Sequence, residues 1–262
     1  MYSATPRVKA AWRRVLGWSL ARARLDWELT DYDAPAPLEA LWARQDLGAV
    51  MMCGLPYSRR VPGATLVVSP VPSPARYAGK AIYFTDIVVR ADSPHRKLED
   101  TFGGVVGYTL EDSMSGCAAL RRHLLPFRET HGQRLYKSAV GGLVNGRRVI
   151  EALAAGEIDL GPLDSYYHEL LRQDEPGTAE KVRVIATTHA APIPPLVATA
   201  PLPAEEFARI RAALLEAGAT PDLAPERALL LLDRFAIPEE ADYQVFREIG
   251  RASCRERVSK QV

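Results

Sequence analysis

Apolar and polar residues follow two periods along this chain. Residues 6–24 place apolar side chains at helical spacing, whereas residues 81–90 form a long β-rich segment. Such segments alternate over most of the sequence, which predicts an α/β architecture with mostly parallel sheets. The predicted strands are 2–5, 25–29, 48–54, 64–69, 81–90, 135–140, 158–165, 182–187 and 196–199. The predicted helices are 6–24, 38–44, 143–155, 166–172, 203–217 and 225–235.

The segment 105–125 reads as a short apolar strand, a polar turn and a helix. Leu120 and Leu124 share one face of that helix, and Ser113 and Ser115 lie at its predicted start. Small oxygen-bearing side chains there cap amides that lack helical partners. The same position also favours an anion, because the amino end of a helix is partly positive. The turn is therefore either an ordinary N-cap or an anion site.

Two proline-rich breaks divide the chain. They lie at 70–79 and 189–195, and they bracket a central segment. We predict one lobe from 1–79 plus 191–248 and a second, inserted lobe from 80–190. In open α/β sheets ligands bind beyond the carboxyl ends of strands, so we expect a ligand cleft between the lobes.

Composition excludes several classes of protein. The chain has 262 residues, of which 47% are hydrophobic and 25% charged, and its formal net charge is +1. This near-neutral balance gives no reason to expect a nucleic-acid partner. The sequence has no apolar run of membrane-spanning length and no signal-peptide pattern at its start. Three widely spaced cysteines and five scattered histidines indicate neither a disulfide framework nor a metal site.

Both ends of the chain need separate treatment. Residues 248–258 resemble the translation of a common sequencing-adapter oligonucleotide fused to a truncated gene. We therefore treat 249–262 as a non-native tail and leave it out of functional reasoning. The first predicted strand begins almost at Met1, which leaves open that an upstream piece is missing.

Several motifs in order resemble the phosphonate/phosphate-type (PhnD-like) periplasmic substrate-binding proteins of ABC transporters. The motifs are Tyr83-x-Thr85-x-Ile87-Val88-Val89-Arg90, Leu98-Glu99-Asp100-x-x-Gly103, Asp112-Ser113-Met114-Ser115-Gly116, Leu163-Asp164-Ser165 and Pro194-Pro195-Leu196-Val197-Ala198. The resemblance implies the two-lobed type 2 periplasmic-binding fold, an α/β fold. It covers roughly residues 1–246.

The resemblance also implies a set of ligand-binding residues. They are Ser113, Met114, Ser115, Asp164, Tyr83, Ser138 and Cys53. The 113–115 turn would present hydroxyls and amides to a tetrahedral head group, and Asp164 would accept a hydrogen bond from the ligand. Tyr83 would wall the cleft, and Ser138, after the next strand, is a weaker assignment. From residue type alone, Asp164 could instead cap a helix, Tyr83 could pack a strand, and Cys53 reads as a small buried hydrophobe.

The resemblance implies the binding component of an ABC importer, which closes on a small anion without chemistry or cofactor. Permease subunits would be its partners, and we expect a monomer in the periplasm. Without a signal peptide, a complete chain would be cytoplasmic. Two alternatives stay open: an enzyme on the same fold, such as a menaquinone- or thiamine-pathway enzyme, or a cytoplasmic ligand sensor. An enzyme would need a positioned base, nucleophile or metal, and the sequence offers no such set.

Overall fold

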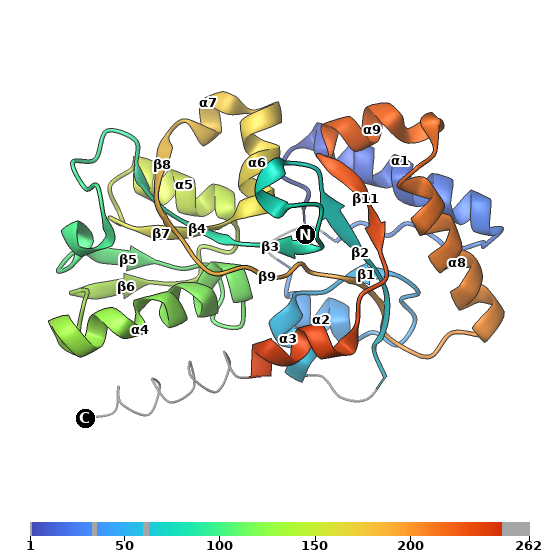
Figure 1. Cartoon of the computed structure of the whole chain (residues 1–262), viewed down its shortest axis with the longest axis horizontal. Helices are drawn as coiled ribbons and strands as arrows, with labels where there is room; N and C mark the ends of the chain where they lie inside the picture. The colour runs from blue at the N-terminus through green and yellow to red at the C-terminus, as the bar shows by residue number, and fades with distance from the viewer. Residues whose placement is uncertain (1, 33–35, 60–62, 248–262) are drawn as a thin grey trace. The chain divides into compact units, whose positions relative to one another are not determined.

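The computed structural model divides the chain into two compact units, each with its own sheet (Figure 1). The residues it describes are 2–32, 36–59 and 63–247. Unit 1 contains the described residues up to Ile82 and Pro192–Gln244. Unit 2 contains Tyr83–Ala191 and residues 245–247. The predicted non-native tail, 249–262, lies outside the described residues.

Unit 1 is built on a four-stranded sheet with the strand order β1-β10-β2-β11. The strands are β1 (Val50–Met51), β2 (Thr65–Pro72), β10 (Leu196–Ala198) and β11 (Leu232–Ala236). All three neighbouring pairs are antiparallel. Every residue of β2 after its first is buried, as expected for a strand paired on both edges.

Three helices cover this sheet, and shorter elements accompany them. Helix α8 (Ala204–Ala217) packs on β2 and β11, and α1 (Pro6–Ala23) packs on α8 and α9 (Ala224–Leu229). The Thr5 hydroxyl accepts a hydrogen bond from the Val8 amide at 3.1 Å, which fixes the start of α1. The shorter elements include α2 (Leu38–Ala43), α3 (Gly54–Arg59) and a 3₁₀ turn (Glu240–Gln244).

Unit 2 has two groups of strands. In the first, β4 (Thr85–Arg90) lies between β7 (Gly161–Asp164) and β8 (Val182–Thr187), and both pairings are antiparallel. In the second, β5 (Val105–Gly107) and β6 (Ser138–Val140) are parallel. A parallel bridge between Val106 and Leu160 links the two groups. Two short strands, β3 (Ile82–Tyr83) and β9 (Ala191–Pro192), pair with each other.

Four helices accompany the strands of unit 2 (Figure 1). They are α4 (Ala119–His131), α5 (Gly146–Ala154), α6 (Ser165–Asp174) and α7 (Pro176–Ala179). Helix α6 packs on β4 and β7, and α4 packs on β4. The buried cluster between α4 and the strands consists of Ile87, Val89, Leu98, Leu120, Leu124, Leu135 and Leu160. This core holds the carboxyl ends of β5 and β7 in one unit.

Several sequence predictions were wrong about strands. The prediction of mostly parallel sheets was wrong. In the described residues, five strand pairs are assigned as antiparallel, and β5 with β6 is the one pair assigned as parallel. Periodicity identifies strands but carries no information on their direction. Residues 25–29 alternate in burial without pairing, because Trp27 packs over Gly48 and Leu29 lies against Gly17. Residues 2–5 are not part of an assigned strand either.

The predicted helix 225–235 is only half correct. Helix α9 ends at Leu229, and Leu231 adopts a left-handed conformation with φ of 47°. The chain then continues as β11, which adds to the open edge of β2. Leu232 and Phe235 are three residues apart and both are buried. That spacing is compatible with a helix, and also with this strand, whose register shifts between Leu232 and Arg234. The apolar pattern alone therefore could not distinguish a helix from a strand here.

Candidate functional site

The turn after β5 begins a helix in an unusual way. Residues Met114–Ala118 form a π-helical turn that continues directly into α4. The Ser113 hydroxyl oxygen accepts a hydrogen bond from the Gly116 amide at 3.0 Å, so the predicted N-cap is present. The first-turn amides that follow Ser113 have no carbonyl one turn earlier. Such amides can serve as donors to an anion.

Gly116 is required by the close approach of the chain on either side of this turn. A Cβ atom at this position would lie 1.8 Å from Oγ1 of Thr109 and 2.8 Å from Oγ of Ser113. The Thr109 amide donates to the Gly116 carbonyl at 3.0 Å, which holds the strand exit against the helix start. The turn is therefore closely packed, with no room for a side chain at position 116.

Ser115 connects this turn to two strands. Its hydroxyl donates a hydrogen bond to Oδ2 of Asp164 at 3.2 Å. Its backbone carbonyl accepts from the Thr85 hydroxyl at 3.1 Å. Thr85 begins β4 and Asp164 ends β7, and the two residues are direct partners in the sheet. The structure thus brings Ser115 and Asp164 together from turns 49 residues apart.

Asp164 is a helix cap as well as a partner of Ser115. Its Oδ1 accepts hydrogen bonds from the amides of Tyr166 at 3.0 Å and Tyr167 at 3.1 Å, which begin α6. The carboxylate is partly buried and accepts from donors on both oxygens. The helix-cap interpretation is therefore confirmed, whereas the contact between Asp164 and a ligand stays a prediction.

The aromatic residue next to this turn, Tyr108, is held in place by its surroundings. The guanidinium of Arg121 lies 5.8 Å from the centre of its ring. A Cβ atom on Gly141 would lie 2.3 Å from the ring, so Tyr108 packs directly on the backbone that follows β6. Burial raises the pKa of the Tyr108 phenol, and Glu111 raises it further. The phenol is therefore a neutral donor near pH 7.

Of the other predicted site residues, Met114 lies in the same π-helical turn, where it is buried. Tyr83 is 1% exposed in β3. Ser138 opens β6 opposite Val105, at the amino end of the parallel pair, whereas the Ser113–Ser115 turn follows the carboxyl end. The structure therefore does not bring Ser138 to Ser115. Cys53 is a buried free cysteine in unit 1, ahead of α3.

Sequence reasoning did not single out Thr85, although it binds the Ser115 carbonyl. Its signal was its place in the Tyr83-x-Thr85 motif, in a strand whose other residues are mainly apolar. In the part of the chain that the structure describes, no group of three or more His, Cys, Asp or Glu residues could hold a metal ion. No described helix is long and apolar enough to cross a membrane.

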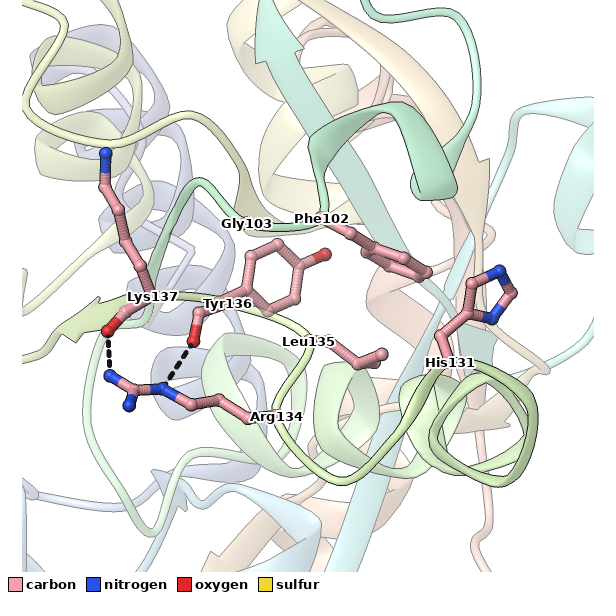
Figure 2. Close-up of a pocket in the computed structure, with 7 residues that line it drawn as sticks. All are labelled: Phe102, Gly103, His131, Arg134, Leu135, Tyr136 and Lys137. Atoms are coloured by element: carbon pink, nitrogen blue, oxygen red, sulfur yellow. Dashed lines mark hydrogen bonds between the residues drawn. The ribbon is translucent and has the colours of Figure 1, made fainter.

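A surface hollow of about 530 Å³ lies elsewhere in unit 2 (Figure 2). It is lined by Phe102, Gly103, His131, Arg134, Leu135, Tyr136 and Lys137. In Figure 2 the Arg134 side chain turns back to the backbone carbonyls of Tyr136 and Lys137. None of the predicted site residues lines this hollow, so we treat it separately from the Ser115–Asp164 turn pair.

The fold and this turn pair define a class, the two-lobed α/β binding proteins of type 2 periplasmic-binding fold. Residues 36–243 match the family of ABC-transporter phosphonate periplasmic substrate-binding proteins, and the chain belongs to that family. This family is periplasmic, and its members bind a small ligand and work with transporter permeases. The match does not support the enzyme or sensor alternatives. No curated protein matches the chain at a significant level.

Solved structures agree with the fold at low sequence identity. A binding-protein component of an ABC phosphonate transporter from Pseudomonas aeruginosa is 16% identical with a TM-score of 0.80, covering 98% of this chain and 85% of that one. PhnD1 from Prochlorococcus marinus, solved with methylphosphonate, is 15% identical with a TM-score of 0.76, covering 94% and 93%. A Xanthomonas citri protein solved with ATP is 17% identical with a TM-score of 0.67, covering 96% and 95%.

Proposed function

We propose that this protein is the solute-binding component of an ABC-type importer and holds a small tetrahedral oxyanion of the phosphate or phosphonate class. The observation that carries the proposal is the hydrogen bond from Ser115 to Asp164, which joins two strand-end turns in unit 2. Family membership supports the transport role. The methylphosphonate bound to PhnD1, a protein of similar fold, supports the ligand class.

The chemistry of the Ser115 hydroxyl suggests how the anion is held. A serine hydroxyl has one proton, and that of Ser115 is directed at Asp164. When an oxyanion binds, this proton can turn to a charged ligand oxygen. Asp164 then accepts a hydrogen bond from a protonated oxygen of the ligand, which replaces the one from Ser115. After this exchange of hydrogen bonds, both the Ser115 hydroxyl and the Asp164 carboxylate still have a partner. A serine hydroxyl without a neighbouring carboxylate could not provide this exchange.

Asp164 would also select the charge state of the ligand. A carboxylate repels a fully ionised oxyanion and accepts from one that keeps a proton. Inorganic phosphate and alkylphosphonates lose their second proton close to neutral pH. We therefore expect affinity to fall as pH rises above this range. Asp164→Asn, which removes the negative charge, should make the pH dependence flatter.

The remaining assignments follow from the family and stay predictions. The amide of Met114 would donate to the ligand beside Ser115, while Tyr83 and Cys53 would contribute from their own segments. Permease subunits would be the protein partners, and the periplasm the place of action. We propose binding without chemistry, since importers release their solute unchanged.

Calorimetric titration with inorganic phosphate and methylphosphonate tests the site. A hydrogen bond to a charged group contributes about 1.5–3 kcal/mol, so Ser115→Ala should weaken binding by roughly tenfold to a hundredfold. Ser138→Ala is the matched control, because it also removes a serine hydroxyl. Ser138 is exposed and lies at the amino end of the β5–β6 pair, away from Ser115. The control should bind as the wild type does.

Equal affinities for the two serine variants would reject the site. A loss of stability in Ser115→Ala with unchanged affinity would mean that the hydroxyl is only structural, since a lost hydrogen bond costs about 1 kcal/mol of folding free energy. Titrations of Asp164→Asn at pH 6 and pH 8 then separate its two roles. A pH dependence as steep as that of the wild type would exclude Asp164 from ligand selection.

A further inference from the structure

A chain of polar side chains is buried directly behind the proposed site. His168 of α6 and Asp86 of β4 are both 0% exposed, and Nδ1 of His168 lies 3.1 Å from Oδ2 of Asp86. The hydroxyl of Thr187 in β8 donates to Oδ1 of Asp86 at 3.1 Å. Three elements of unit 2 are thus joined through one carboxylate.

In this position, one ring nitrogen of His168, Nε2, has no hydrogen-bond partner among the described residues. A carboxylate accepts only, so the Nδ1–H of His168 is the donor to Asp86. Nε2 of His168 is itself buried. An unpaired buried polar atom and a buried charge both oppose folding, and apolar replacements of a buried pair are often as stable or more so. Stability alone therefore does not account for the pair.

The pair is adjacent to the site through the backbone of β4. Neighbouring residues of a strand point to opposite faces, so Thr85 and Asp86 diverge. Thr85 binds the Ser115 carbonyl, and Asp86 binds His168. Asp86 and Thr187 are direct partners in the sheet, which places their side chains on one face. Strand β4 thus contacts the Ser115 turn on one side and helix α6 on the other.

Helix α6 carries the second half of the proposed site. Asp164 is its N-cap, and His168 follows four residues later, within the helix. The first residue of α6 is held next to β4, since the Ser165 hydroxyl accepts from the Phe84 amide at 2.9 Å and the Ser165 amide donates to the Phe84 carbonyl at 3.0 Å. The hydrogen bond from His168 to Asp86 is directional, and it adds a second fixed point one turn further along the helix.

We propose that His168 is a positioning residue for ligand binding. Its bond to Asp86 fixes the rotation of α6 and so directs the Asp164 carboxylate at Ser115 and at the oxyanion. The inference rests on the proposed function, because it assigns His168 an effect that passes through Asp164. His168 does not itself contact the ligand.

The double variant Asp86→Val with His168→Leu tests this without leaving a buried charge unpaired. It should remain folded, with a melting temperature close to that of the wild type or above it. Its affinity for methylphosphonate should nevertheless fall about tenfold, within the range of couplings between residues of one network. His168→Asn, whose side-chain amide can donate to Asp86 from about the position of Nδ1, should keep most of the wild-type affinity.

A second background shows whether the effect passes through Asp164. In the Asp164→Asn variant, adding Asp86→Val and His168→Leu should change the affinity little further. The same fractional loss in both backgrounds would overturn the proposal, and so would wild-type affinity in the double variant. If Ser115→Ala and Asp164→Asn also bind as the wild type does, or the wild type binds no oxyanion, the proposed function fails. If those two variants are weakened, only the positioning role fails.

Discussion

At the scale of single residues, the site depends on a glycine that neither donates nor accepts through a side chain. Gly116 allows Thr109 and Ser113 to approach the helix start from two directions. Any side chain there would displace the Ser113 cap or the strand exit. The turn therefore owes its shape to exclusion of a Cβ atom as much as to its hydrogen bonds.

Gly116→Ala should destabilise the protein by about 1–3 kcal/mol, the usual cost of overpacking a tight site. Gly177→Ala is the matched control, since a Cβ atom there would meet nothing within 4 Å. The control should be neutral or slightly stabilising, because alanine favours a helix over glycine. Urea denaturation of the two variants measures the difference. Equal midpoints would contradict the close approach.

At the scale of elements, the loop between α4 and β6 is anchored by Tyr136. The Thr101 hydroxyl donates to the Leu98 carbonyl at 2.6 Å, so its oxygen accepts from the Tyr136 hydroxyl at 3.0 Å. Phe102 meets Tyr136 edge-on with ring centres 5.8 Å apart, beside the hollow of Figure 2. Burial raises the pKa of Tyr136 from 10.0 to about 12. The loop is therefore held by a neutral phenol.

This pKa predicts a loss of stability in alkali. Because the folded pKa is raised, the contribution of Tyr136 is complete below pH 10 and disappears as pH rises toward 12. Tyr136→Phe cannot ionise, so its unfolding free energy should fall less between pH 9 and pH 11.5 than that of the wild type. At pH 7 the variant should lose about 1 kcal/mol with its hydrogen bond. Denaturant titrations at the three pH values measure this, and equal alkaline losses would contradict it.

Elements with a clear period and a clear stop could be predicted from the sequence. Strand 182–187 and helix 203–217 match β8 and α8, and Gly156 follows α5 with a φ of 73° as a helix C-cap does. The failures share a cause. Residues 25–29 and 225–235 have apolar spacings that a packed loop and a strand satisfy equally well, and only tertiary contacts decide between them.

The candidate site was predictable where local chemistry determines it. Serine and aspartate at strand ends are typical helix N-caps, and both Ser113 and Asp164 act as N-caps in the structure. The buried pair was not predictable, because Asp86 and His168 lie 82 residues apart and neither has a local signature. Sheet pairing and helix packing bring them together, and a single sequence does not specify either.

At the scale of the whole molecule, the order of the motifs identified the fold, although the predicted direction of most strands was wrong. The family match and structures only 15–17% identical agree on the same fold. Such agreement is expected when a fold is fixed by the pattern of elements rather than by particular side chains. Enclosure of the ligand between two lobes stays a prediction from the family. The monomeric state stays a prediction as well, and so does the absence of a nucleic-acid partner, which was expected from the net charge of +1.

The central claim is that the intact protein binds a small tetrahedral oxyanion, and thermal unfolding tests it most directly. A ligand that binds only the folded state stabilises it by about 2.7 kcal/mol at a hundredfold excess over its dissociation constant. Unfolding should therefore be followed with inorganic phosphate, methylphosphonate, sulfate and an organic sulfonate, each at increasing concentration. We expect a melting temperature that keeps rising with the logarithm of the phosphate or methylphosphonate concentration at pH 6, and that rises less at pH 8. An unchanged melting temperature with all four anions at both pH values would contradict the account.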